Sequence, residues 1–362
     1  MTMRAPERRM EVFMSTEYYN PNRDEGPRIV AIGGGTGLST MLRGLKRHTE
    51  NITAIVTVAD DGGGSGMLRE DLGMPPPGDI RHCMESLANA EPVMGQLLHY
   101  RFPSDSGRLA GQSFGNLILA ALNGIAPSFD QAVTMMSQVL AITGRVLPVT
   151  NENVQLEAEF ENGTKVVGES KIFAFKKEQD CRITQVKLLP EHPSALPDAV
   201  EAIRSADLIV FGPGSLYTSV IPNLLVNGIV DAVADSKAMR VYVCNIMTQE
   251  GETEGYTVSD HVRALLEHGK PGMLDLCLAN SAPIPSYLVE KYRPENAVPI
   301  QVDRAATEAL GVELVTRPIA NTAAMDFARH DPLRLSKELL DLLYSRCVRV
   351  STDRGIRYIL ER

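Results

Sequence analysis

Two glycine-rich segments, each directly after a short apolar run, are the residues of this sequence best suited to bind a phosphate. Residues 28–32 (RIVAI) lead into Gly33-Gly34-Gly35-Thr36-Gly37, and residues 208–211 (LIVF) lead into Gly212-Pro213-Gly214-Ser215. Glycine lets the backbone approach a phosphate closely, and a helix after the loop offers free N–H groups and a positive dipole end. Two such loops predict a long ligand. The alternative for the first loop is a tight strand-to-helix turn without a ligand.

A pair of acids follows another apolar run. Residues 52–59 (ITAIVTVA) end at Asp60 and Asp61, and a glycine run that contains Ser65 comes next. The two carboxylates could hold a ribose hydroxyl pair or, through one oxygen, a Mg²⁺ that bridges phosphates. The alternative is an Asp-Gly turn with solvated acids. The flexible glycines after an apolar strand favour one of these binding roles over the turn, with Asp60 and Asp61 as the candidate magnesium ligands.

Uncharged polar residues follow a further apolar run at residues 241–245. The segment from Asn245 to Thr253, with Thr248 and Gln249, carries amide, hydroxyl and acid groups that could bind sugar hydroxyls. Ser215 and Thr218, after the second glycine loop, could cap a helix or bind a phosphate. The alternative for residues 245–253 is a polar surface loop.

Residues 75–83 (PPPGDIRHC) predict a stiff turn and the start of a helix near Asp79. Asp79 could be the N-cap of this helix or a catalytic acid, and Arg81 could reach a phosphate. His82 could transfer a proton, but a single histidine on a helix usually has no such role. His261 and His268 share one predicted helix face and are expected to form a solvated stripe rather than a metal site.

Three familiar motifs are absent. The dinucleotide pattern GxGxxG, counted from Gly33, meets Leu38 at its third glycine, and no P-loop or nucleophile elbow is present. The chain is therefore not expected to be an NAD-dependent oxidoreductase or a P-loop ATPase. NAD or another dinucleotide could still occupy the same loops, because they fit any pyrophosphate.

The composition of the chain limits which partners and which cell compartment are expected. The 362 residues are 44% hydrophobic, which allows a large core, and the net charge of −9 opposes binding to nucleic acid or anionic lipid. The five cysteines are far apart, as expected in a reducing cytosol. No apolar stretch is long enough to cross a membrane. We therefore expect a cytoplasmic protein that holds phosphate locally.

Apolar runs that end in Gly, Asn or Asp loops and lead into helices predict a doubly wound, mostly parallel α/β sheet of the Rossmann type. A small β-rich insertion is expected at about residues 146–190, around a hairpin turn at Asn162-Gly163. Residues 1–27 are expected to be a mobile tail, residues 28–344 the α/β domain and residues 345–362 a C-terminal extension. The expected strands are residues 28–32, 52–59, 208–211, 241–245 and 274–279, and the expected helices include residues 78–101, 114–122, 129–140, 195–205, 259–268 and 333–343.

Six ordered segments resemble one known family. They are IGGGTGLSTMLRGLK, VTVADDGGGSGMLRE, PPPGDIRHC, GNLILAAL, FGPGSLYTSVIPNLLV and NIMTQEGETEGYTVSDHV. Together they resemble the gluconeogenesis factors (YvcK-like, UPF0052), within the CofD-like group that includes the 2-phospho-L-lactate transferases. The resemblance covers about residues 28–343. It departs from the family at Gly64, where a serine is expected, and at His82, where an asparagine is expected.

The resemblance implies a cytoplasmic protein that binds UDP-sugars such as UDP-N-acetylglucosamine and is needed for cell shape and for growth on gluconeogenic carbon. A regulatory binding protein with no required cofactor, a protein partner and a homo-oligomeric state is therefore expected. The alternative is a Mg²⁺-dependent transferase with a nucleotide-linked phosphoryl donor. The absence of Trp and the 5% aromatic content disfavour the flat acceptor pocket of such an enzyme. The expected ligand-binding residues are Gly33, Gly34, Gly35, Thr36, Gly37, Asp60, Asp61, Ser65, Arg81, Asn116, Gly212, Gly214, Ser215, Thr218, Asn245, Thr248 and Gln249.

Overall fold

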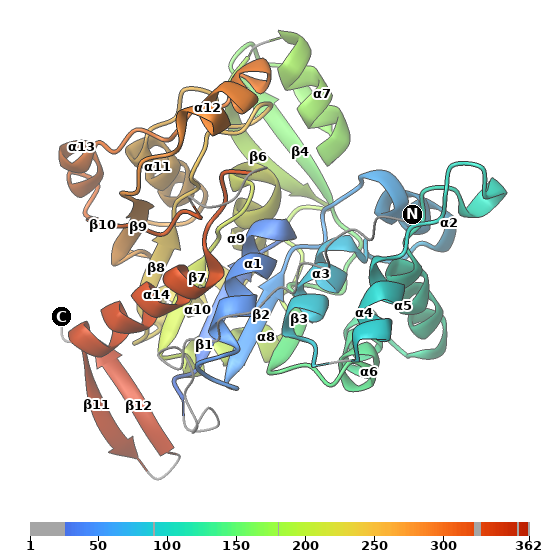
Figure 1. The fold of residues 1–362 in the computed structure, drawn as a ribbon, viewed down its shortest axis with the longest axis horizontal. Coiled ribbons are helices and arrows are strands. Elements are labelled where there is room, and N and C mark those ends of the chain that lie inside the picture. The colour runs from blue at the N-terminus through green and yellow to red at the C-terminus, as the bar shows by residue number, and fades with distance from the viewer. Residues whose placement is uncertain (1–25, 90, 180, 322–326, 353–354, 361–362) are drawn as a thin grey trace, which may run out of the picture.

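A parallel sheet of seven strands forms the centre of the computed structural model, which describes residues 26–89, 91–179, 181–321, 327–352 and 355–360 (Figure 1). In spatial order the strands are β10 (Glu313–Arg317), β9 (Leu276–Asn280), β8 (Met239–Val243), β7 (Leu208–Phe211), β1 (Ile29–Gly33), β2 (Ile52–Val56) and β3 (Arg145–Pro148). Every pairing between neighbours is parallel. The predicted doubly wound α/β fold is therefore confirmed.

The central strands are buried because their sequences are apolar on both faces. All residues of β1, β2, β7 and β8 are buried, as expected for parallel strands covered by helices on both sides. Arg240 in β8 is a polar exception, and its guanidinium and backbone N–H all bond the carboxylate of Asp275 at 2.6 to 2.9 Å. This ion pair lies at the end of β8 opposite the loops that carry the site.

Helices cover both faces of the sheet. On one face α1 contacts α3 and α14, and on the other α8 contacts α10 (Figure 1). The helices are α1 (Gly35–Leu45), α2 (Gly63–Leu72), α3 (Gly78–Leu87), α4 (Pro92–His99), α5 (Phe114–Ile125), α6 (Phe129–Val139), α8 (Pro197–Ser205), α9 (Ile221–Leu224), α10 (Ile229–Asp235), α11 (Val258–His268), α12 (Ser286–Tyr292), α13 (Arg304–Glu308) and α14 (Pro332–Arg346). Within the described residues no helix combines the length and the apolar character that a bilayer crossing requires.

The single helix predicted over residues 78–101 is wrong, because two helices occupy this segment. α3 ends at Leu87, and Pro92 occupies the start of α4. Proline fits the first turn of a helix but lacks the N–H that would continue an earlier one. α3 therefore ends at Leu87, and the separate helix α4 begins at Pro92.

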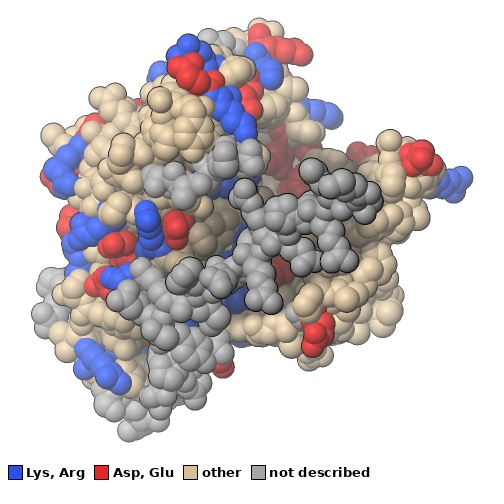
Figure 2. Space-filling model, in the orientation of Figure 1, with Lys and Arg blue, Asp and Glu red and all other residues tan. Residues whose placement is uncertain are grey.

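The β-rich insertion forms a separate antiparallel sheet in the order β5-β4-β6. It contains β4 (Gln155–Phe160), β5 (Lys165–Val167), helix α7 (Glu169–Gln179) and β6 (Ile183–Leu189). The predicted turn at Asn162-Gly163 joins β4 to β5, with Gly163 at φ +80°. However, the expected insertion also included residues 146–148, which lie in β3 of the main sheet. In the orientation of Figure 1, Figure 2 shows a hollow between this insertion and the α2 side of the molecule, with acidic atoms inside it.

The C-terminal segment is a hairpin of β11 (Cys347–Thr352) and β12 (Gly355–Leu360), which extends beyond the lower end of the sheet in Figure 1. The side chain of Arg357 donates to the buried carboxylate of Asp207 at 2.7 Å. This contact attaches the hairpin to the segment before β7, at the opposite edge of the sheet from the glycine loops.

Candidate functional site

The first glycine loop connects β1 to α1 and lies against the second. Gly35 has φ +66°, a left-handed backbone conformation that favours glycine. A Cβ atom on Gly37 would lie 2.5 Å from the carbonyl oxygen of Pro213, so the close approach of the two loops requires glycine here. The loops after β1 and β7 therefore form one continuous surface, at the N-terminus of α1.

The second glycine loop leads from β7 into a π-helical turn (Leu216–Val220) and α9. Ser215 occupies the N-cap position, but its hydroxyl does not cap the turn and instead donates to Gln249 Oε1 at 2.9 Å. The hydroxyl of Thr218 donates to Glu252 Oε1 at 2.7 Å. The expectation that either hydroxyl caps a helix is therefore wrong for both.

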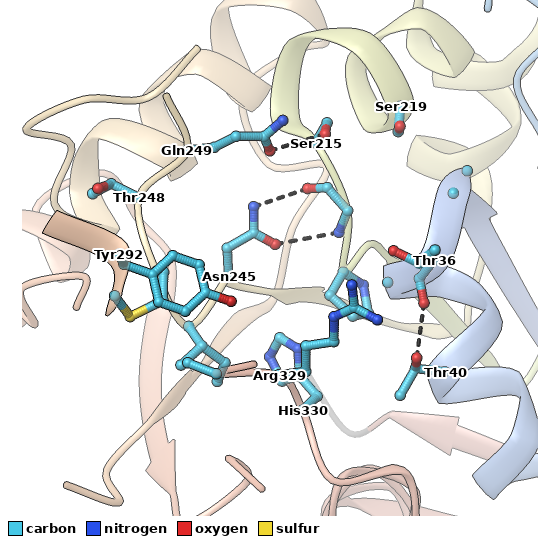
Figure 3. Close-up of a pocket in the computed structure, with 18 residues that line it drawn as sticks. Thr36, Thr40, Ser215, Ser219, Asn245, Thr248, Gln249, Tyr292, Arg329 and His330 are labelled. Carbon is cyan, nitrogen blue, oxygen red and sulfur yellow. Dashed lines mark hydrogen bonds between the residues drawn. The ribbon is translucent and has the colours of Figure 1, made fainter. Parts of the chain in front are cut away.

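The loop after β8 braces the second glycine loop. Asn245 accepts a hydrogen bond from the N–H of Gly214 at 3.2 Å and donates to its carbonyl oxygen at 2.9 Å (Figure 3). Thr248 Oγ1 accepts the N–H of Val298 at 2.9 Å. All three residues expected to bind sugar hydroxyls thus also have structural partners, since Gln249 accepts the bond from Ser215.

These three loops enclose a cavity of about 340 Å³. Figure 3 shows Thr36, Ser215, Asn245 and Gln249 around it. The complete lining is Gly34, Gly35, Thr36, Gly37, Thr40, Pro213, Gly214, Ser215, Ser219, Asn245, Ile246, Met247, Thr248, Gln249, Tyr292, Ala328, Arg329 and His330. Nine of the residues expected to bind ligand line this one cavity. They are Gly34, Gly35, Thr36, Gly37, Gly214, Ser215, Asn245, Thr248 and Gln249.

Sequence reasoning missed the wall formed by residues 328–330 and Tyr292. Arg329 is exposed and brings a positive charge to the cavity. His330 is buried, donates from Nε2 to the carbonyl of Cys244 at 3.1 Å, and has its pKa lowered to about 4 by burial. These residues follow no glycine loop and no apolar run. The only local sign of a binding site in the sequence was the pair Arg329 and His330, next to Asp331.

Four acids lie close enough for their charges to act on one another. Asp79 is not the N-cap of α3, because Pro77 holds that position, and its carboxyl instead bonds the backbone N–H of Gly35. Burial and the nearby charge of Asp60 raise the pKa of Asp79 to about 7. Burial and Asp60 also raise the pKa of Glu169. We call Asp60, Asp79, Glu169 and Glu252 the acidic cluster.

Glu252 is the most completely enclosed acid of the acidic cluster. It is 4% exposed, and its carboxylate accepts bonds from the Thr218 hydroxyl at 2.7 Å and the Tyr217 N–H at 3.3 Å. Burial raises its pKa to about 7, although both hydrogen bonds act in the opposite direction. Burial therefore lets Glu252 and Asp79 keep their protons to a higher pH than exposed carboxyls do.

Asp60 and Asp61 point to different partners. Asp60 Oδ1 accepts the N–H of Gly62 at 2.7 Å, whereas Asp61 Oδ1 accepts the N–H of Ser170 in α7 at 2.8 Å. A Cβ on Gly78 would lie 3.1 Å from Asp60 Oδ2 and 2.5 Å from Ser65 Oγ, so these side chains meet at the start of α3. Among the described residues no group of three or more His, Cys, Asp or Glu is placed to hold a metal ion. The magnesium site stays a prediction.

Arg81 and Asn116 lie together, but away from the cavity. Arg81 Nε donates to Asn116 Oδ1 at 2.8 Å, and its Nη1 forms a short ion pair with Glu85. His82 contacts Arg81 Nη2 at 2.8 Å, and burial together with Arg81 lowers its pKa to about 4. Arg81 is buried with its charge paired, so in this structure it braces α3 against α5.

The expected solvated stripe on α11 is wrong. His261 is fully buried, and its Nδ1 donates to the carbonyl of Thr257 at 2.8 Å. His268 is partly buried, and its Nε2 accepts the N–H of Val186 in β6 at 3.0 Å. Burial lowers the pKa of both. His268 therefore joins the insertion to the main domain.

Known proteins match this chain along most of its length. The family described as 2-phospho-L-lactate transferase CofD matches residues 29–320. The gluconeogenesis factor of Bacillus subtilis (strain 168) is 49% identical over 317 residues, which are 88% of this chain and 98% of that protein. The gluconeogenesis factor of Listeria monocytogenes serovar 1/2a is 42% identical over 321 residues, which are 89% and 97% of the two chains. A crystal structure of a UPF0052 family protein from Bacillus halodurans has a TM-score of 0.82 and 45% identity, and the match covers 87% of this chain and 99% of that chain.

Proposed function

Because this chain belongs to the CofD family and matches gluconeogenesis factors along most of its length, we propose that it is a regulatory protein that binds a nucleotide-sugar. The proposed ligand is of the UDP-N-acetylglucosamine type. In this proposal the protein acts in the cytoplasm, where it helps allocate cell-wall precursors on gluconeogenic carbon and so maintains cell shape.

The observation that carries this proposal is the contact between the two glycine loops. The loops follow the adjacent strands β1 and β7, and Gly37 and Pro213 touch at their junction. Backbone N–H groups at the start of α1 and the guanidinium of Arg329 lie in the same cavity. A diphosphate needs two neighbouring sets of hydrogen-bond donors and a cation. This arrangement offers both locally, although the net charge of the whole chain is negative.

Uncharged polar groups surround the proposed diphosphate position. Thr36, Thr40 and Ser219 bring hydroxyl groups to the cavity, and Gln249 brings an amide (Figure 3). Hydroxyl and amide groups exchange hydrogen bonds with sugar hydroxyls without adding charge. This lining suits a sugar linked to the diphosphate better than a second charged group.

A Mg²⁺-dependent transferase of the phospholactate type remains the second candidate, and the acidic cluster favours it. Asp60 and Asp79 lie next to the first glycine loop, where a carboxylate-bound Mg²⁺ would reach a phosphate. Asp79 and Glu252, with pKa values raised to about 7, have the acidity expected of a general base. A dinucleotide such as NAD is a third ligand that the glycine loops would accept.

Calorimetric titration of the full chain with UDP-N-acetylglucosamine, GDP and NAD⁺, with and without Mg²⁺, tests the proposal. We expect UDP-N-acetylglucosamine to bind most tightly and to remain unchanged after long incubation, as followed by ³¹P NMR. Hydrolysis or transfer of its phosphoryl group would support the transferase, and preferred binding of NAD⁺ would overturn the nucleotide-sugar assignment. Light scattering with and without ligand measures the proposed homo-oligomer, and co-purification tests for the protein partner.

A further inference from the structure

The C-terminal hairpin has one edge bound to the rest of the chain and one edge without a neighbouring strand. On the β12 edge, the N–H of Tyr358 donates to Asp207 Oδ1 at 3.2 Å, and Nε of Arg357 donates to the same oxygen at 2.7 Å. In Figure 1 the hairpin extends beyond the lower end of the main sheet, with β11 on its outer side. Among the described residues, β12 is the only strand that pairs with β11.

The register of the hairpin shows which backbone groups of β11 are free. Opposite residues in an antiparallel pair alternately exchange two hydrogen bonds and none. The N–H of Tyr358 points to Asp207 and away from β11, so Tyr358 and its partner Arg349 exchange none. The N–H and C=O of Arg349, and by alternation those of Ser351, therefore point away from β12. No other described segment exchanges a backbone hydrogen bond with them.

β11 lacks the features that usually protect a free strand edge, which are lysines, prolines and bulges. Its sequence is CVRVST, in which Arg349 is the only charged residue, and its pairing with β12 runs without a bulge. Val348 and Ile359 lie opposite each other and are 44% and 37% exposed. A sheet of only two strands is marginally stable in water. A further strand alongside β11 would therefore stabilise the hairpin.

We propose that the free edge of β11 pairs with β11 of a second copy of this chain, antiparallel and about a two-fold axis at Val350. Such an axis makes one strand edge complementary to itself, so a second copy presents a matching edge.

The position of the axis follows from the sequence of β11. An axis at Arg349 would place two guanidinium groups opposite each other, which is unfavourable. An axis at Val348 or at Ser351 would pair only residues 347–349 or 350–352, because Arg346 belongs to α14 and Thr352 ends β11. An axis at Val350 pairs residues 348–352 and places Val350 opposite its copy.

This pairing joins two hairpins into one sheet in the order β12-β11-β11-β12. Tyr358 contacts Tyr344 of α14, with ring centroids 5.3 Å apart, so Val348 and Ile359 lie on the face of the hairpin that does not carry this contact. In the joined sheet, these residues of both copies form one apolar face. The glycine loops lie at the opposite edge of the main sheet, so both ligand cavities stay open. The inference is therefore independent of the proposed nucleotide-sugar.

Arg349→Pro tests the edge because proline removes the outward N–H of this position and no hydrogen bond to β12. In analytical ultracentrifugation of the full chain, we expect a concentration-dependent dimer for the parent and a monomer for Arg349→Pro. Arg349→Ala is the matched control, since it keeps the N–H, and should remain a dimer. A dimeric Arg349→Pro, or a parent that is monomeric at every concentration, would overturn the proposal. A monomeric parent that still binds UDP-N-acetylglucosamine would leave the proposed function intact.

Cross-linking tests the register, and it decides the question even if proline disturbs the hairpin. Val350 and its copy form a pair without hydrogen bonds between them, whose Cα atoms lie about 4.5 Å apart, within the range of a disulfide. Val348→Cys is the matched control, because Val348 is more exposed but would lie about 13 Å along the strand from its copy. After mild oxidation, Val350→Cys should give a covalent dimer, and Val348→Cys and the parent should not. A covalent dimer of Val348→Cys alone, or of neither variant, would overturn the proposal.

Discussion

Replacement of Glu252 by glutamine should make the protein more stable at alkaline pH and remove much of its pH dependence. The carboxylate is 4% exposed and accepts hydrogen bonds from the Thr218 hydroxyl and the Tyr217 N–H. In Glu252→Gln the amide oxygen can accept the Tyr217 N–H, and the amide NH₂ can donate to the Thr218 hydroxyl. The packing is thus preserved while the buried charge disappears.

The sign of the effect follows from the raised pKa of Glu252. The folded chain holds this proton until about pH 7, whereas the unfolded chain loses it near 4.5, so the folded state binds more protons between these values. The free energy of unfolding therefore falls as the pH rises through this window. The displacement from 4.5 to about 7 corresponds to about 3 kcal/mol, most of which is lost between pH 5 and pH 8.

Urea denaturation of parent and Glu252→Gln chains at pH 5 and pH 8 measures this contribution. The variant should gain about 2 to 3 kcal/mol relative to the parent on going from pH 5 to pH 8. Glu267→Gln, at an exposed position of α11, is the control and should follow the parent at both pH values. If parent and Glu252→Gln lose stability in parallel between pH 5 and pH 8, the burial of this carboxylate does not control its ionisation.

Three further predictions concern the ligand site. Gly35→Val and Gly214→Val should each abolish UDP-sugar binding while the circular dichroism spectrum is retained. The reason is that Gly35 has φ +66° and that a Cβ on Gly214 would lie 3.1 Å from the Gly34 carbonyl oxygen. Parent-like affinity in both variants would refute the hypothesis that these loops bind phosphate. Arg329→Ala should weaken UDP and UDP-N-acetylglucosamine about equally, by roughly tenfold, as calorimetry in low salt can measure; a loss confined to the sugar conjugate would place the guanidinium at the sugar. Asp60→Asn should remove any Mg²⁺ dependence of nucleotide binding, whereas Asp61→Ala should lower the melting temperature through its lost bond to Ser170 and leave Mg²⁺ dependence unchanged.

Five of the seven strands of the main sheet, and the loops after them, could be predicted because their signal is local, whereas β3 and β10 were not. An apolar run such as LIVF is nearly sufficient to predict a buried parallel strand, and the glycines after it mark the loop at its carboxyl end. Parallel strands place those ends at one edge of a sheet, so the loops from Gly34 to Gly37 and from Gly212 to Ser215 were expected at the same edge, where they could share one long ligand. The cavity contains both loops, although no pattern showed that Gly37 would touch Pro213.

The acidic cluster could not be predicted, because its members come from four distant segments. Glu169 belongs to the insertion and Glu252 to the loop after β8, and each is surrounded in the sequence by ordinary polar residues. Asp79 was expected to be either an N-cap or a catalytic acid, since aspartate near a helix start can have either role, but the fold turns it to the N–H of Gly35. His261 likewise fits a polar stripe by spacing, and only the packing of α11 buries it.

The protonation of the acidic cluster links stability to the choice between the two candidate functions. If the sugar lies at this end, the raised pKa values of Glu252 and Asp79 require no metal, because neutral carboxyls donate to sugar hydroxyls while carboxylates accept from them. If a Mg²⁺ is held there with the nucleotide, the cation must favour the carboxylate forms and lower both pKa values. Nucleotide with Mg²⁺ would then restore at pH 8 the stability that Glu252 costs the parent, beyond the gain that nucleotide alone provides. If nucleotide with Mg²⁺ restores the stability of the parent but not that of Glu252→Gln, the transferase is favoured. If both chains gain the same stability, the binding protein is favoured.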